Sequence, residues 1–427
     1  MPTLEYLQPD FLTAACAAAR WIVSRQSGSH WASRPDESIE DQIDFYYGNA
    51  GTILLFRELA ESTGEPGYQE IAFNGAIYMA AQMEKVTHCG FFHGLAGMAF
   101  ALDQLMRTSE DRSLLGPLNR AIEQLQIHVQ QGHSTLRSDE SNDLASGLAG
   151  IGLVLLHLAK ESGKSGLLES AKVAGDRLIT LAQNSPNGVY WTLSEASTLE
   201  YPNFSHGTAG IGYFLAALFE ATKDERYLGR ALAAGAYLRS TMSKAPSSNC
   251  LVPHDQRTGR SLFYLGWCHG PAGTGRFFFR LYQLTDEPAW LDLVTQQAVT
   301  LQDSGIPERQ TLGYWNNVSR CCGAAGVGEF FLGLYTATKE KTYLTFAQRI
   351  AVYLISRAER VEDGMKWTQS ETRLEPDYLL AQTGLMQGAA GIGLFLVHVA
   401  QISQHQKPLI RFPDEPQWEN NQLPTPP

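Results

Sequence analysis

The stretch SHGTAGIGYFLAALFEATKD at residues 205–224 joins a Gly-x-x-Gly motif to an apolar run of helical length. Six further copies of the motif occur, at intervals between 46 residues (Gly48 to Gly94) and 65 residues (Gly323 to Gly388). A motif that recurs at such a period indicates one repeat architecture and not several unrelated domains. The copies read YGNAG (47–51), HGLAG (93–97), SGLAG (146–150), HGTAG (206–210), HGPAG (269–273), CGAAG (322–326) and QGAAG (387–391).

The segments after the glycines predict the fold. They are apolar on nearly every side, as in GVGEFFLGLYTATKE from Gly326, and a helix of this kind is buried. More amphipathic segments, such as 227–242 and 290–301, follow them and would lie outside. Seven such alternations predict an all-α fold, an α/α toroid with a double ring of about fourteen helices. The N-termini of the inner helices would gather at one pole.

The domain organisation follows from where the repeats stop. Residues 1–406 are predicted to form a single toroid domain. Residues 407–427, KPLIRFPDEPQWENNQLPTPP, are rich in proline and are expected to form an extended or disordered tail, or to wrap the surface.

Composition excludes several classes of function. The 427 residues carry a formal net charge of −11, which argues against non-specific nucleic-acid binding. No run of about 18 uncharged apolar residues is present, so no membrane span is expected. The N-terminal residues MPTLEYLQPDFL do not resemble a secretory signal. Six cysteines in so long a chain do not indicate a disulfide framework, and a cytoplasmic location is expected.

Three cysteines stand at matched positions of adjacent repeats. Cys268 and Cys321 lie two residues before the first glycine of their motifs, and Cys322 lies one residue before it. Neighbouring repeats should be neighbours in the ring, so the three thiols are expected to meet at its inner mouth. Three protein ligands with an open fourth position are typical of catalytic zinc, and soft thiolates favour that metal. The alternative is that they are small buried apolar residues; His269 is a possible substitute ligand.

Two further residues are expected at the same mouth. His206 precedes the first glycine of the fourth repeat, and Asp143 lies four residues before Gly147 in the third. Either residue alone is as easily explained by helix capping or packing. His93 and Asp44 occupy the equivalent positions in other repeats, and for His93 the structural role is preferred.

The chain resembles the lanthionine synthetase C-like family over roughly residues 40–400. The resemblance rests on the seven glycine motifs and on WCHGPAG (267–273) and RCCGAAG (320–326) in adjacent repeats. The family comprises cyclases of lanthipeptide biosynthesis and relatives that add glutathione. The resemblance implies a zinc ion that lowers the pKa of a peptide cysteine thiol. The thiolate then adds to dehydroalanine or dehydrobutyrine and forms a (methyl)lanthionine thioether ring.

By position, the resemblance also implies roles for individual residues. Cys268, Cys321 and Cys322 would be the zinc ligands. His206 would be the general acid or base, with Asp143 as the acidic residue that accompanies it.

Two positions depart from the usual family pattern. Cys322 stands where the third ligand is usually histidine, and Tyr264 stands where most cyclases carry arginine. Three thiolates outweigh the two charges of the metal, so zinc would be a weaker Lewis acid and the thiolate more nucleophilic. Arg257, Arg260 and Arg320 are nearby in sequence, but the sequence assigns none of them the missing role.

The expected partners are a dehydrated precursor peptide and a separate dehydratase. Three rival functions are compatible with the sequence. The first is a glutathione transferase that modifies dehydro residues with the same zinc site. The second is a toroid glycosidase that uses Asp44 and Asp143 as a carboxylate pair, which leaves the cysteines unexplained. The third is a non-catalytic peptide-binding toroid with structural zinc.

Overall fold

The computed structural model describes residues 10–35, 38–107, 111–131 and 141–419, and within them the chain is mostly helical. Seven helices begin at the glycine motifs and form the inner ring. They are α3 (Asn49–Thr63), α5 (Leu95–Met106), α7 (Leu148–Ser162), α9 (Thr208–Thr222), α11 (Pro271–Thr285), α13 (Ala324–Thr338) and α15 (Ala389–Ser403). Each packs against the next, and α15 packs against α3, so the inner ring is closed.

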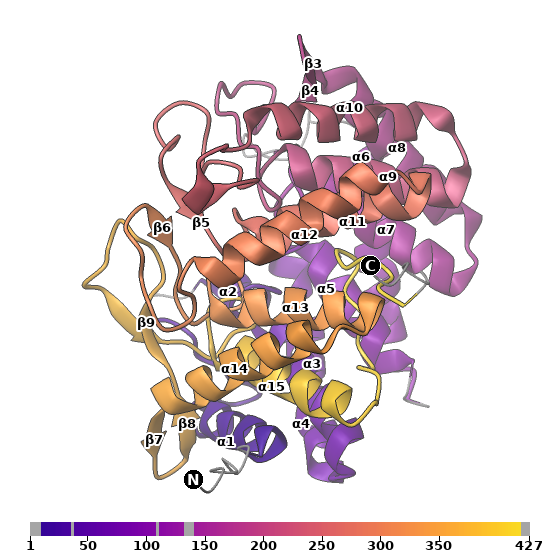
Figure 1. Cartoon of the computed structure of the whole chain (residues 1–427). Helices are drawn as coiled ribbons and strands as arrows, with labels where there is room; N and C mark the ends of the chain where they lie inside the picture. Colours follow the sequence, from indigo (N-terminus) through magenta and orange to yellow (C-terminus); the bar gives the residue numbers. More distant parts are fainter. Residues whose placement is uncertain (1–9, 36–37, 108–110, 132–140, 420–427) are drawn as a thin grey trace, which may run out of the picture.

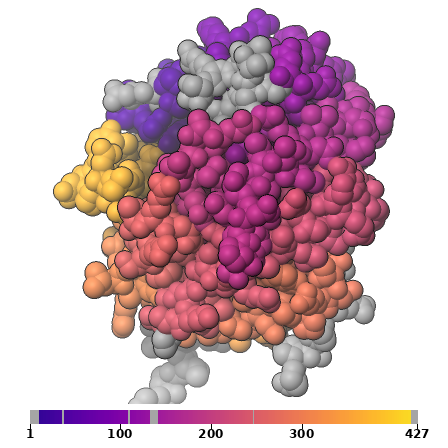
Figure 2. Space-filling view, turned by 90° about the horizontal axis from the view of Figure 1, so that it is seen from above, coloured from indigo at the N-terminus to yellow at the C-terminus, as the bar shows by residue number. Residues whose placement is uncertain are grey.

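The outer ring covers the inner one helix for helix (Figure 1). The outer helices are α1 (Phe11–Ser24), α4 (Pro66–Gln82), α6 (Leu115–Gln131), α8 (Ser165–Leu181), α10 (Glu225–Thr241), α12 (Pro288–Asp303) and α14 (Lys341–Arg357). Six of them pack on the inner helix that precedes them in sequence, but α1 packs on α15. Figure 2 accordingly shows the indigo N-terminal part of the chain beside the yellow C-terminal part. The predicted α/α toroid is confirmed.

The remaining elements are short and lie in the connections. A short helix, α2 (Ile39–Ile43), precedes the first motif, and 3-10 turns occur at Met83–Lys85 and Pro246–Ser248. Antiparallel pairs join β1 (Gln26–Ser27) to β2 (His30–Trp31), β3 (Gln183–Ser185) to β4 (Gly188–Tyr190), β7 (Glu359–Val361) to β8 (Gly364–Lys366), and β9 (Thr368–Ser370) to β10 (Leu379–Ala381). A parallel pair joins β5 (Phe263–Tyr264) to β6 (Tyr314–Trp315). No helix among the described residues is both long and apolar enough to cross a membrane.

Close backbone approach explains the two glycines of each motif. The second glycine of the fourth repeat, Gly210, starts its helix against the chain that leads into it. A Cβ there would lie 2.0 Å from the carbonyl oxygen of Phe204. The first glycine, Gly207, would place a Cβ 1.9 Å from the carbonyl oxygen of Tyr201. A Cβ would meet the same kind of clash in the other repeats. Glycine is therefore required at these positions because each loop folds back onto the start of the helix that it precedes.

The segment after α15 returns to the inside of the toroid. Residues 404–419 contain no helix or strand, yet Ile410 and Phe412 are buried and Trp418 contacts Phe279 of α11. This differs from the expected extended, disordered or surface-wrapping tail, because its apolar side chains fill the space that the inner helices leave on the ring axis. Residues 420–427 lie outside the described part of the chain.

Candidate metal centre

The loops before the seven inner helices are tied into a closed circle by backbone hydrogen bonds. Each bond joins the residues two positions before the first glycine in neighbouring repeats, with N···O distances of 2.8–3.1 Å. The N–H donors and carbonyl acceptors run from Tyr46 to Phe92, Ala145, Ser205, Cys268, Cys321 and Met386, and from Met386 back to Tyr46. The sequence-based alignment of the repeats is therefore an alignment in space.

This circle brings the three cysteines together. Cys268 N donates to the carbonyl oxygen of Cys321 at 3.1 Å. The Cys268 and Cys322 sulfurs are 3.4 Å apart, and those of Cys321 and Cys322 are 3.6 Å apart. All three Sγ atoms lie within 4.8 Å of one another, and all three side chains are buried. His269, the possible substitute ligand, is not part of this group.

The sulfur geometry fits a zinc ion. Tetrahedral zinc with Zn–S bonds of about 2.3 Å spaces its sulfurs by about 3.8 Å, close to the separations found here. Within the cluster, hydrogen bonds from Cys268 and Cys321 lower the pKa of the Cys322 thiol, whereas burial and the neighbouring sulfurs raise the pKa of Cys268.

His206 and Asp143 form a hydrogen-bonded pair at the same mouth. His206 Nδ1 lies 2.7 Å from Asp143 Oδ2; the Asp143 side chain is 1% exposed and that of His206 is 37% exposed. Burial alone would lower the pKa of His206, but the hydrogen bond and charge of Asp143 outweigh it and raise that pKa. Burial would raise the pKa of Asp143, and His206 lowers it instead. Asp143 therefore favours the protonated form of the His206 imidazole.

His93 and Asp44 repeat this arrangement elsewhere on the ring. His93 Nδ1 lies 3.0 Å from Asp44 Oδ2, but burial dominates here and raises the pKa of Asp44. Both carboxylates also accept backbone N–H groups of the motif loop just before the next helix, from Tyr47 for Asp44 and from Ser146 for Asp143. The N-caps of those helices, Gly48 and Gly147, have no side-chain cap, so the two acidic residues hold the motif loops and do not cap the helices. What distinguishes the Asp143 pair is its neighbour, because His206 stands beside the cysteine-bearing fifth repeat.

The structure places the arginines near Tyr264 in different surroundings. Arg320 is buried and pairs with Glu329 and Glu415, away from the mouth. Arg373, which no sequence motif singled out, interacts with the Tyr264 hydroxyl through a side-chain hydrogen bond and its charge. It lies in the loop between β9 and β10, where no glycine-motif register identifies it.

Two further histidines lie beside the mouth. His254 stacks on His269 with ring centroids 4.6 Å apart, and His269 lies 5.6 Å from the ring of His206. Burial, followed by the charges of His206 and His254, lowers the pKa of His269 far below its ordinary value, so it is neutral. His254 comes from a loop outside the motif, which is why repeat alignment could not find it.

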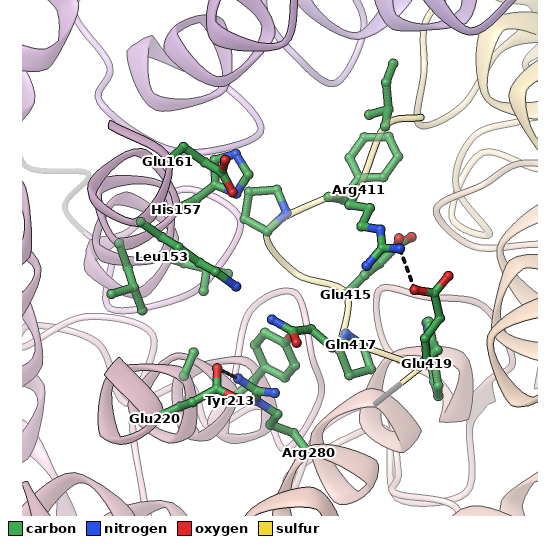
Figure 3. Close-up of a pocket in the computed structure, with 18 of the residues that line it drawn as sticks. Leu153, His157, Glu161, Tyr213, Glu220, Arg280, Arg411, Glu415, Gln417 and Glu419 are labelled. Carbon is green, nitrogen blue, oxygen red and sulfur yellow. Dashed lines mark hydrogen bonds and ion pairs between the residues drawn. The ribbon is translucent and has the colours of Figure 1, made fainter. Parts of the chain in front are cut away.

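A cavity lies at the opposite end of the toroid from the cysteines. It measures about 860 Å³ and is lined by residues from the middle and C-terminal parts of α7, α9, α13 and α15, by Arg280 of α11 and by residues of the segment 408–419 (Figure 3). Glu220 and Arg280 pair across one side of it, and Arg411 pairs with Glu419. The cysteines stand before the helix N-termini, so this cavity is not the metal centre.

Fold and site together define an α/α toroid with a three-thiol site and an Asp–His pair at one pole. The chain belongs to the lanthionine synthetase C-like family, whose model, described as Lanthionine synthetase C-like protein, matches residues 40–410. It is 23% identical over 369 residues to the Danio rerio protein named glutathione S-transferase LANCL1, covering 79% of this chain and 84% of the relative.

Solved structures share the fold at low identity. Nisin cyclase superposes with a TM-score of 0.68 at 15% identity, covering 93% of this chain and 94% of that one. An unsaturated glucuronyl hydrolase specific for heparin superposes with a TM-score of 0.52 at 13% identity, covering 94% of this chain and 98% of that one. The toroid is thus common to proteins whose names state different activities, and the residues at its mouth must decide the chemistry.

Proposed function

We propose that the protein is a zinc-dependent lanthipeptide cyclase. The observation that carries this proposal is the meeting of three buried cysteine sulfurs with the Asp143–His206 pair at one pole of a toroid of this family. A glycosidase would not require the thiols, and Asp44 and Asp143 are each committed to a histidine.

Cys268, Cys321 and Cys322 would hold the zinc, and a bound zinc would supply a peptide cysteine as a thiolate at neutral pH. The sulfur forms a bond to the β-carbon of a dehydroalanine or dehydrobutyrine residue, and the Cα–Cβ π bond breaks. His206, kept protonated by Asp143, delivers a proton to the α-carbon. The thiol proton leaves to solvent and His206 regains a proton from solvent, so the net change is addition of S–H across the double bond. Arg373 stands beside Tyr264 to stabilise the developing enolate oxygen.

The substrate would be a precursor peptide that a separate dehydratase has prepared. The three thiols must stay reduced, so the proposal requires a reducing compartment such as the cytoplasm.

Metal analysis and a peptide assay test the proposal together. Purified protein is expected to contain one zinc per chain, and to consume the free thiol of a dehydrated, cysteine-containing peptide without changing the peptide mass. Alkylation of remaining thiols followed by mass spectrometry reads that loss. Full activity in a metal-free preparation would contradict the proposal.

A second candidate is addition of glutathione to dehydro residues, which the name of the Danio rerio relative favours. Offering glutathione and a dehydrated peptide without cysteine separates the two candidates. A product heavier by one glutathione supports the transferase, and ring formation with no such adduct supports the cyclase. Zinc without either reaction would support a non-catalytic toroid.

A further inference from the structure

The segment after α15 reaches the chain that carries the metal ligands. Leu409 N and Ile410 N donate to Glu58 of α3, at 2.8 Å and 3.0 Å, and fix where the segment enters the ring. Its side chains then approach the inner face of the cysteine loops, on the side away from the mouth. Phe412 lies beneath the guanidinium of Arg320, with 4.5 Å between the arginine Cζ and the ring centroid.

Asp414 binds the residue before the first ligand. Its Oδ2 accepts the indole N–H of Trp267 at 2.8 Å and pairs with Arg276 Nη1 at 2.9 Å. Trp267 directly precedes Cys268, and all three of these side chains are buried. A charged, buried acceptor of this kind makes a strong hydrogen bond and is costly to remove.

Glu415 binds the residue before the second ligand. Its Oε1 lies 3.1 Å from Arg320 Nη2 and 3.5 Å from Arg276 Nη2. Arg320 directly precedes Cys321, and its other terminal nitrogen pairs with Glu329 at 2.6 Å. Adjacent acidic residues of one segment thus bind the side chains next to Cys268 and Cys321.

We propose that Asp414 and Glu415 are positioning residues of the metal centre, which set the spacing of Cys268 and Cys321 by holding Trp267 and Arg320. This inference rests on the proposed function and deepens it by naming what holds the ligands. Mutation of a residue that orients a metal ligand typically weakens metal binding by about 10- to 100-fold. A segment that merely filled the ring would stabilise the fold and leave metal affinity unchanged.

Cobalt titration of the full-length protein tests this. Asp414→Ala is expected to weaken Co²⁺ binding, measured by chelator competition, by about 10- to 100-fold, and to alter the visible absorption of the thiolate-coordinated metal. Asp414→Asn, of nearly the same shape, serves if the alanine variant does not fold, and is expected to change both readouts in the same direction. Circular dichroism verifies that each variant is folded.

Glu58→Gln is the matched control. Glu58 is also buried and anchors the same segment, but it lies on α3 and binds Leu409 and Ile410 rather than Trp267 or Arg320. This variant is expected to unfold at lower temperature while retaining wild-type cobalt affinity and spectrum. Wild-type affinity and spectrum in folded Asp414 variants, or an equal loss of affinity in Glu58→Gln, would overturn the proposal.

A metal-free readout separates this inference from the proposed function. Cross-linking of Cys268 to Cys321 or Cys322 by a short bis-alkylating reagent such as a dibromoalkane, which forms two thioether bonds and releases two bromide ions and two protons, is mapped by peptide mass spectrometry. It is expected to be efficient in the wild type and reduced in the Asp414 variants. If the wild type takes up no metal, the proposed function fails, and the cross-linking yields still decide whether Asp414 positions the loops. Equal yields would refute the positioning role.

Discussion

His206 Nδ1 and Asp143 Oδ2 are 2.7 Å apart although 63 residues separate them in the chain. The bond crosses from the third repeat to the fourth, and His93 and Asp44 make the equivalent bond from the first repeat to the second at 3.0 Å. Two pairs with the same geometry thus occupy two places on one ring. Only the His206 pair adjoins the cysteine-bearing repeats. The His93–Asp44 pair can therefore serve as a control that has the same geometry but lies elsewhere on the ring.

The two histidines should differ in their effect on catalysis. His206→Ala is expected to retain the metal but to slow ring formation by about 10²- to 10⁴-fold, the usual contribution of a general acid. His93→Ala is expected to retain both the metal and the wild-type rate of ring formation. Metal content and initial rates with a dehydrated peptide measure this, and equal losses in both variants would refute the assignment.

Removing the charge of Asp143 should move the pH dependence of the reaction. Asp143 raises the pKa of His206 above its ordinary value of 6.5, so the acid form persists to higher pH. Activity that needs this form falls as pH rises through the raised pKa, and Asp143→Asn should shift that fall to lower pH. The pair also contributes to the free energy of unfolding. Because the pKa of His206 is raised in the folded state, this contribution is fully present at pH values below the unfolded-state pKa of about 6.5 and is lost as the pH rises through the raised pKa.

The pH profile of the rate and the NMR titration of the His206 ring measure this shift. An unchanged profile in a folded Asp143→Asn variant would show that the acid in the reaction is another group.

The third cysteine should decide metal binding and reactivity separately. Cys322→Ala is expected to lose zinc, whereas Cys250→Ala, which removes another buried free thiol, is expected to retain it. Cys322→His restores the more usual family ligand and is expected to bind zinc with slower addition, because the metal centre becomes less electron-rich. Faster addition by the histidine variant would contradict this reasoning.

Arg373 should contribute to the rate where Arg257 does not. Loss of one donor that stabilises a developing oxyanion costs on the order of 10²-fold in rate, and Arg373→Ala is expected to approach this. Arg257 is exposed in the loop between α10 and β5, and Arg257→Ala is expected to react normally. Single-turnover rates at saturating peptide distinguish this effect from weaker binding.

The motif glycine Gly210 should be far less tolerant of substitution than Gly229, a helical glycine with open space around it. Gly210→Ala places a methyl group 2.0 Å from the Phe204 carbonyl oxygen, and is expected to lower the free energy of unfolding by about 3 kcal/mol. Gly229, in α10, has no neighbouring atom within 4 Å of the position that a Cβ would take, and Gly229→Ala is expected to stabilise by up to about 1 kcal/mol. Urea denaturation measures both values.

Repeat alignment predicted the fold and the meeting of the cysteines well because both depend on register. Position along the motif sets height on the ring axis, so Cys268 and Cys321 share one level and Cys322 follows directly beside them. The same logic placed Asp143 and His206 together. Repeat alignment could not find Arg373 or His254. Both residues lie in loops that differ in length and sequence between repeats, so their positions cannot be aligned with the glycine motif.

The sequence by itself determined the closed ring. Each glycine motif requires the same contact between a loop and the helix that follows it, so the seven repeats share one structure. Each repeat buries its faces against its two neighbours, and the last repeat packs on the first. Only the tertiary structure decided which groups bind the residues beside Cys268 and Cys321. Asp414 lies 146 residues after Cys268, in a segment whose composition resembles a solvent-exposed tail. Its carboxylate is buried because Trp267 and Arg276 offer it an indole N–H and a positive charge, and such pairing across the ring leaves no periodic trace in the sequence.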